Sequence, residues 1–161
     1  MVGCSESMLS KIECDRVRPS LQMLHRISNV LDTSIGNLFA EQRESDVTVY
    51  RRGKRPVVVI AGDDSKPPIR LERLAPHFEE QQIDGNIHII EPGANNGGEI
   101  KHLGQEIGYV LEGEIELVVG DQRHHLTEGD SFFFKSDLPH SYRNIGKNLA
   151  RIIWINTPPT F

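Results

Sequence analysis

From residue 57 to its end, the chain is a series of short runs rich in β-branched and aromatic residues, with turn residues between them. No run of helical period interrupts this series. Many short strands in close succession, without helices between them, are typical of an all-β sandwich or barrel. The sequence therefore predicts a mainly β fold with strands over 57–61, 69–74, 87–90, 107–111, 115–119, 124–126, 131–134 and 151–155.

The first forty residues have a different pattern, in which Ser or Thr precedes each of three groups of apolar residues at helical spacing. The groups are Met8, Leu9 and Ile12 after Ser5; Leu21, Leu24, Ile27, Val30 and Leu31 after Ser20; and Ile35, Leu38 and Phe39 after Thr33-Ser34. The sequence therefore predicts a helical segment over 1–40, a linker and first strand over 41–66, and a β domain over 67–161.

Composition limits the location of the chain and its partners. The longest nearly unbroken apolar run, residues 56–61, is far shorter than the roughly 20 residues that a membrane span needs, and no secretory leader pattern begins the chain. We therefore expect a cytoplasmic protein with no membrane partner. Cys4 and Cys14 lack the spacing of a zinc ribbon, and two cysteines make no disulfide framework.

Charge is unevenly distributed along the chain. Residues 57–161 carry nine Lys/Arg and sixteen Asp/Glu, whereas residues 1–40 carry four of each. Phosphate binding requires basic residues, so a nucleic-acid surface is expected only in the first third of the chain.

Two stretches of the β region resemble the paired motifs of the cupin family, which are small double-stranded β-helix barrels of the jelly-roll kind. The first motif is G-x5-H-x-H-x3,4-E-x6-G, and here His102, Glu106 and Gly113 match it while Ile100 replaces the first His. The second motif is G-x5-P-x-G-x2-H-x3-N. Its matches are Gly129, His140 and Asn144, and Lys135 and Asp137 replace the Pro and Gly.

The helical segment resembles the lambda-repressor-like helix-turn-helix of the xenobiotic-response-element family. Residues 3–13 (GCSESMLSKIE) and 16–21 (RVRPSL) match the phrase that runs through the recognition helix of that family. Regulators with a C-terminal cupin sensor, including the putrescine-utilisation repressors, share this arrangement. The family domain has five helices and this chain begins at the turn before the third, so we expect an N-terminally truncated domain. Residues 1–40 would then lack their apolar partners within the domain, and we expect them to be poorly ordered or to pack against a symmetry-related copy of the chain.

The cupin resemblance implies an effector pocket lined by Ile100, His102, Glu106, His140 and Trp154. Two imidazoles and one carboxylate suit Zn, Mn, Fe or Ni as divalent ions. The loss of the first His leaves two other interpretations open, an organic ligand held without metal and a polar remnant without a ligand. A carboxylate in a closed, acidic barrel favours an amine-bearing effector if no metal is present.

The helix-turn-helix resemblance implies DNA contacts by Ser5, Glu6, Ser7, Lys11, Arg16 and Arg18. DNA binding is expected of the complete helix-turn-helix and is in doubt for the truncated chain. We therefore interpret the sequence as a homodimeric transcriptional regulator, not an enzyme, whose cupin domain binds a small effector. The alternative is a cupin metalloenzyme, a dioxygenase, lyase or isomerase, that uses His102, Glu106 and His140.

Overall fold

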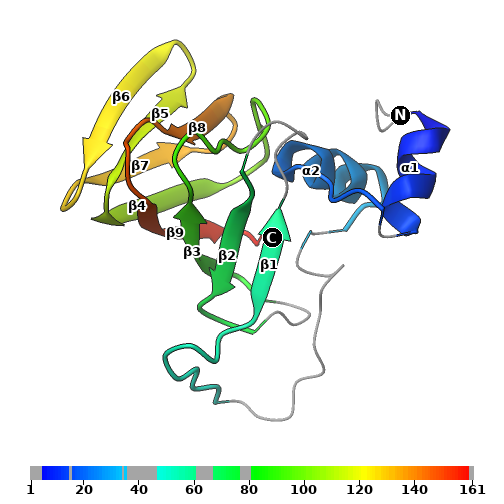
Figure 1. The fold of residues 1–161 in the computed structure, drawn as a ribbon, viewed down its shortest axis with the longest axis horizontal. Coiled ribbons are helices and arrows are strands. Elements are labelled where there is room, and N and C mark those ends of the chain that lie inside the picture. Colours follow the sequence, from blue (N-terminus) through cyan, green and yellow to red (C-terminus); the bar gives the residue numbers. More distant parts are fainter. Residues whose placement is uncertain are drawn as a thin grey trace.

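The computed structural model describes residues 5–14, 16–33, 35, 47–60, 67–76 and 81–159 (Figure 1). The helices of this part are α1 (Glu6–Glu13) and α2 (Leu21–Val30). Its strands are β1 (Val57–Ile60), β2 (Ile69–Arg73), β3 (Asp84–Ile90), β4 (Gln105–Glu112), β5 (Glu114–Val119), β6 (Gln122–Thr127), β7 (Ser131–Lys135), β8 (His140–Asn144) and β9 (Ala150–Thr157).

The strands form two antiparallel sheets, with the order β1-β2-β3-β9-β4-β7 in one and β6-β5-β8 in the other. Their inner faces enclose one apolar core, to which Ile90, Ile115 and Ile152 contribute fully buried side chains. Gly108 on β4 leaves room for the ring of Phe132, because an added Cβ at this position would lie 2.1 Å from that ring. This architecture confirms the mainly β fold.

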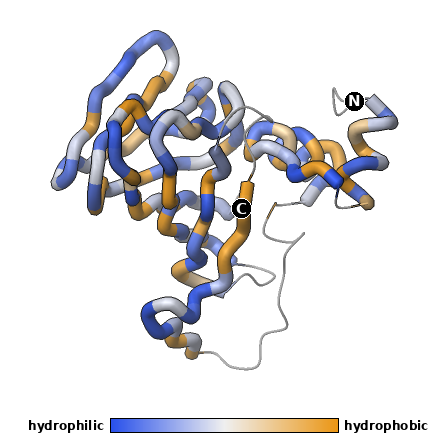
Figure 2. Tube along the Cα trace, viewed as in Figure 1, coloured by the Kyte–Doolittle hydropathy of each residue, from blue (hydrophilic) through white to orange (hydrophobic). Residues whose placement is uncertain are grey.

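The sequence placed most strands correctly but misread two segments. β3 begins at Asp84, three residues before the strand expected over 87–90. The Asp84 carboxylate accepts hydrogen bonds from the Gly85 N–H (2.8 Å) and the Asn86 amide (3.3 Å), so these polar residues can be buried in the sheet. β8 was not expected, because polar residues dominate its sequence. It pairs with β5 and alternates buried with less buried residues (Figure 2 shows the mixed hydropathy of the strands).

The first two expected helices are present, with the expected caps. Ser5 Oγ accepts a hydrogen bond from the Met8 N–H (3.3 Å), and Ser20 Oγ accepts one from the Met23 N–H (3.2 Å). Most of the third expected helix lies outside the described residues. No helix in the described ranges is long and apolar enough to span a membrane.

The expectation that residues 1–40 lack apolar partners is wrong for α2. Leu21, Leu24 and nearby Ile35 are buried in the same apolar cluster as the barrel core. By contrast, none of the residues of α1 is buried. The barrel thus supplies α2 with the apolar surface that so short a helix needs for stability, and α2 lies between the sheets and α1 (Figure 1).

Candidate functional site

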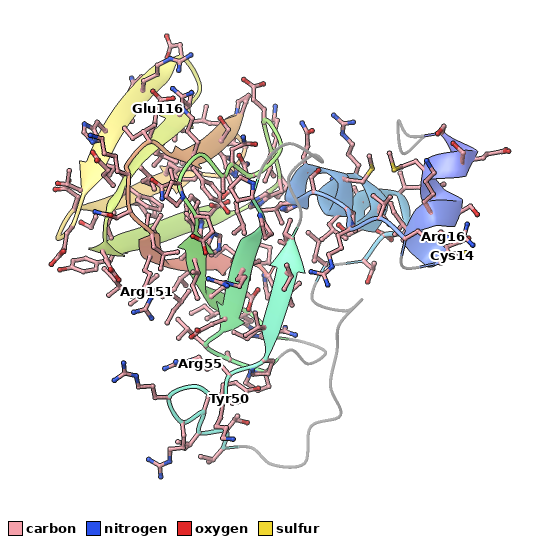
Figure 3. All side chains as sticks on the ribbon, viewed as in Figure 1. Cys14, Arg16, Tyr50, Arg55, Glu116 and Arg151 are labelled. Carbon is pink, nitrogen blue, oxygen red and sulfur yellow. The ribbon has the colours of Figure 1, made fainter. Side chains whose placement is uncertain are left out.

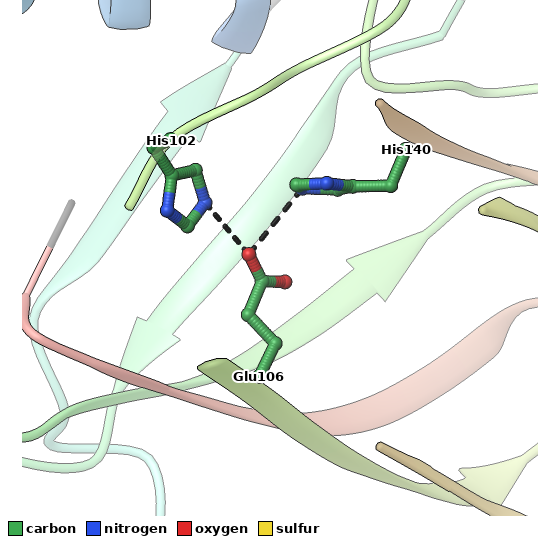
Figure 4. Close-up of side chains that lie close together, drawn as sticks. All are labelled: His102, Glu106 and His140. Carbon is green, nitrogen blue, oxygen red and sulfur yellow. Dashed lines mark ion pairs between the residues drawn. The ribbon is translucent and has the colours of Figure 1, made fainter. Parts of the chain in front are cut away.

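A His–Glu–His cluster lies at the end of the barrel that α2 covers. His102 belongs to the loop before β4, Glu106 to the inner face of β4, and His140 begins β8 (Figure 4). Glu106 Oε1 lies 2.6 Å from His102 Nε2 and 3.3 Å from His140 Nε2. Three atoms of metal-ligand type, all within 4.8 Å of one another, therefore converge from one loop and from one strand of each sheet.

The outer nitrogens of both imidazoles face backbone carbonyls. His102 Nδ1 is 3.1 Å from the Leu103 oxygen, and His140 Nδ1 is 2.9 Å from the Leu138 oxygen. A carbonyl oxygen accepts and does not donate, so each Nδ1 donates a proton to its carbonyl, and Nε2 is the ring nitrogen that faces Glu106. Metal-bound histidines have this same second contact in most proteins.

Glu106 is buried, with 2% of its surface exposed, and its two oxygens differ in their contacts. Oε2 accepts a hydrogen bond from Trp154 Nε1 at 2.5 Å. Oε1, between the two imidazoles, has no hydrogen-bond partner of ordinary geometry among the described residues. Burial alone would raise the pKa of Glu106, but the contacts with His102 and His140 hold that pKa below its usual range. The carboxylate is therefore charged and presents one oxygen to the space between the two rings.

This donor set fits a small divalent cation. Without a proton on Nε2, each imidazole would repel the charged carboxylate oxygen at this distance, and either a proton or a positive ion between them makes the contact attractive. Imidazole and carboxylate suit Zn²⁺ as well as Mn²⁺, Fe²⁺ and Ni²⁺, and three protein ligands leave at least one position open.

The cavity beside the cluster has a volume of only about 10 Å³. That is about the space that one water molecule requires. The cavity is lined by Leu21, His25, His88, Ile100, His102, Glu106, His140, Tyr142 and Trp154. All five residues of the expected pocket therefore lie around one cavity, although their role in ligand binding stays a prediction.

Sequence reasoning missed four of the lining residues, Leu21, His25, His88 and Tyr142. A hydrogen bond of 2.8 Å joins His88 Nδ1 and the Tyr142 hydroxyl, and burial lowers the pKa of His88 to about 3. His25 lies four residues after Leu21, on the face of α2 that the apolar spacing assigns to a core. A histidine on the apolar face of this helix was the sequence signal that could have indicated that α2 lines the cavity.

The expected DNA-contacting residues lie far from this cluster. All six are exposed: Ser5 caps the start of α1, Glu6, Ser7 and Lys11 lie on α1, and Arg16 and Arg18 lie in the segment after it. Figure 3 shows Arg16 near the C-terminal end of α1, on the side of the structure opposite the sheets. These side chains are free to meet a large partner, and their contact with DNA stays a prediction.

Known proteins are similar to both the helical segment and the β domain of this chain. The model of the cupin domain family matches residues 86–156. The "HTH-type transcriptional regulator PuuR" of Escherichia coli is 32% identical over 163 residues, which span 99% of this chain and 84% of that protein. The crystal structure of an HTH_3 family transcriptional regulator from Vibrio cholerae has a TM-score of 0.65 at 20% identity, and the match covers 98% of this chain and 83% of that one.

One similar protein is an enzyme. The "(S)-2-hydroxypropylphosphonic acid epoxidase" of Streptomyces wedmorensis is 29% identical over 150 residues, which cover 85% of this chain and 74% of the enzyme. Because this relative is an enzyme, the metalloenzyme interpretation requires an experimental test.

Proposed function

The chain belongs to the family of helix-turn-helix transcriptional regulators with a C-terminal cupin domain, and from this premise we propose that a ligand bound at His102, Glu106 and His140 controls its binding to DNA. The observation that carries this proposal is the convergence of three ligand atoms in a cavity partly lined by α2, a helix of the DNA-binding segment.

A divalent metal ion is the ligand that this cavity fits best. His102 Nε2, Glu106 Oε1 and His140 Nε2 would hold it, and it would supply positive charge beside Glu106 and an open coordination position. The cavity of about 10 Å³ has room for an ion, whereas pockets for organic ligands have volumes of roughly 300–1,000 Å³.

An amine-bearing effector is the alternative ligand, since a cationic group would also offset the charge of Glu106. A second cavity of about 710 Å³ lies where β6 and β7 form the edges of the two sheets, with Leu117, Leu126 and Phe134 in its wall. The ring of Phe134 lies 4.8 Å from that of His140. Only the ring of Phe134 would therefore separate an organic ligand in this larger space from His140.

The DNA-binding part of the proposal rests on α1. Its exposed polar residues would meet the base edges of the major groove, and Arg16 and Arg18 would meet phosphates. A homodimer would place two such helices at a fixed spacing on the two half-sites of an operator. A ligand that binds one arrangement of the dimer better than another would change DNA affinity by linkage.

An enzymatic function is the second candidate, because the cluster has the two-histidine, one-carboxylate composition of non-haem iron sites and an epoxidase is among the relatives. The two candidates differ in what the cluster does. In a regulator, loss of the metal changes DNA affinity, whereas in an enzyme it abolishes turnover of a substrate.

Selection from a random pool of DNA duplexes tests the regulator directly. We expect the protein to enrich one sequence, and removal of metal by a chelator to change its affinity for that sequence by at least about 5-fold. His140→Ala should abolish this response to metal, whereas His125→Ala, which changes an exposed histidine, should retain it. Failure to enrich any sequence, or equal affinity with and without metal in the wild type, would contradict the proposal.

A further inference from the structure

α2 is in direct contact with the candidate metal site. The imidazole of His25 lies parallel to that of His102, with 5.3 Å between ring centroids and 4° between planes. His25 and Leu21 also line the cavity beside Glu106. Both side chains are buried, with 5% and 1% of their surface exposed. One wall of the site thus belongs to the helical segment rather than to the barrel.

A second contact joins α2 to the loop that leads to His102. The Gln22 side-chain amide donates a hydrogen bond to the Glu99 carbonyl (3.0 Å), and the Gln22 backbone N–H lies 3.4 Å from the Asn96 carbonyl. Gly97 permits close approach in the same region, since an added Cβ would lie 2.8 Å from the Cβ of Ser20. A movement of this loop therefore affects α2 and His102 together.

From these contacts we propose that a divalent ion bound by His102, Glu106 and His140 holds α2 on the barrel, with His25 as the positioning residue that transmits the state of the site. The proposal rests on the proposed function, because it names the element through which the cluster acts on the DNA-binding segment. An ion fixes the ring of His102, and the fixed ring gives His25 a rigid surface to pack against. When the ion is absent, His102 is less constrained and this contact of α2 is weaker.

The proposal has a reciprocal consequence. If the ion strengthens docking of α2 by some factor, docking strengthens ion binding by the same factor. A change that undocks α2 in the ion-free protein must therefore weaken ion binding, by at most that factor. Leu24 provides a test of this, because it is buried in the core cluster and does not line the cavity. A purely local metal site would not respond to Leu24→Ala.

Amide hydrogen exchange of the whole protein, with Zn²⁺ as the probe and a separate titration of Zn²⁺ binding, tests the proposal. In the wild type we expect Zn²⁺ to slow exchange in α2 at least 10-fold and to leave α1, which has no buried residue, unchanged. His25→Ala should still bind Zn²⁺ but lose this slowing. Arg26→Ala changes the neighbouring, exposed residue of the same helix and should behave as the wild type.

Three further outcomes decide the proposal. Where Leu24→Ala undocks α2 in the Zn²⁺-free protein, it should lower Zn²⁺ affinity by up to the factor by which Zn²⁺ strengthens docking in the wild type. An unchanged affinity in a variant whose α2 is undocked without Zn²⁺ would overturn the proposal. His25→Phe keeps a planar ring but not the imidazole, so full retention of the Zn²⁺ effect would assign the coupling to packing through this position and retain the proposal. Zn²⁺ binding without a change in α2 would overturn the proposal and leave the proposed function standing, whereas absence of Zn²⁺ binding would overturn both for this ion.

Discussion

Two His–Glu pairs in this protein have the same separation and very different surroundings. His102 Nε2 and Glu106 Oε1 are 2.6 Å apart with side-chain exposures of 7% and 2%, and His125 Nε2 and Glu114 Oε2 are also 2.6 Å apart with exposures of 56% and 41%. Only the first pair has His140 as a third group. The separation of the two atoms alone therefore does not mark a functional site.

The physical difference lies in the cost of removing charge from water. An exposed ion pair contributes roughly 0–1 kcal/mol to stability, because water solvates each partner nearly as well as the other partner does. A buried carboxylate loses that solvation and depends on its neighbours. Glu106 therefore requires His102, His140 and Trp154, whereas Glu114 does not require His125.

The largest expected effect is on the stability of the metal-free protein. We expect His102→Ala to lower the free energy of unfolding by about 3 kcal/mol, because it leaves the buried charge of Glu106 with one imidazole fewer. The matched variant His125→Ala should change it by less than about 0.5 kcal/mol. Urea denaturation measures both, and equal losses in the two variants would refute the contrast between the pairs.

Substitution of the glutamate in each pair should also have very different effects on metal affinity. Glu106→Gln replaces a charged ligand oxygen by a neutral amide, and we expect Zn²⁺ affinity to fall at least about 100-fold, since loss of even an outer contact of a metal ligand costs roughly 10- to 100-fold. Glu114→Gln should leave it within about 2-fold. Isothermal titration at pH 7.5 measures this difference.

The state of the purified protein provides a check on the same site. Three protein ligands bind an ion less tightly than four, so we expect substoichiometric metal after purification and its loss on chelation. Elemental analysis before and after chelation decides this. Full occupancy that survives prolonged chelation would show a tighter site than three ligands explain.

Much of the barrel was predictable because its strands follow simple rules. Alternating apolar residues and regular turn signals identified most strands, and the motif spacing identified His102, Glu106 and His140. β8 was not predictable from apolar content, since its buried positions are His140, Tyr142 and Asn144. Their burial depends on hydrogen bonds from distant segments, which local sequence does not reveal.

The position of α2 was unpredictable for a related reason. The sequence shows an apolar face, but an apolar face does not specify the surface against which it packs. We expected these residues to lack partners, and the barrel provides them instead. A contact such as His25 on His102 joins residues far apart in the chain, so only the folded structure reveals it.

We expect acid to lower the stability of the protein through its buried histidines and not through its exposed ones. Burial lowers the pKa of His88 to about 3, so between pH 6.5 and 3 the unfolded chain binds a proton that the folded state excludes. Stability therefore falls as the pH decreases through this window, by about 2 kcal/mol at pH 5 for this residue. In the metal-free protein, His88→Gln should reduce the loss between pH 7 and pH 5, and His125→Gln should not. An unchanged loss in His88→Gln would exclude His88 as a source.

The smallest expected effect is that of salt on the exposed pair. Glu114→Gln removes the partner of His125, and we expect the free energy of unfolding at low ionic strength to change by less than about 0.5 kcal/mol. In 0.5 M NaCl the Debye length is only roughly 4 Å, so this small difference should shrink. The cost of His102→Ala should persist, because burial shields its charges from salt. Urea denaturation at both salt concentrations measures the two effects. A cost of Glu114→Gln above about 1 kcal/mol that persists in 0.5 M NaCl would mean that separation, and not burial, determines the strength of these pairs.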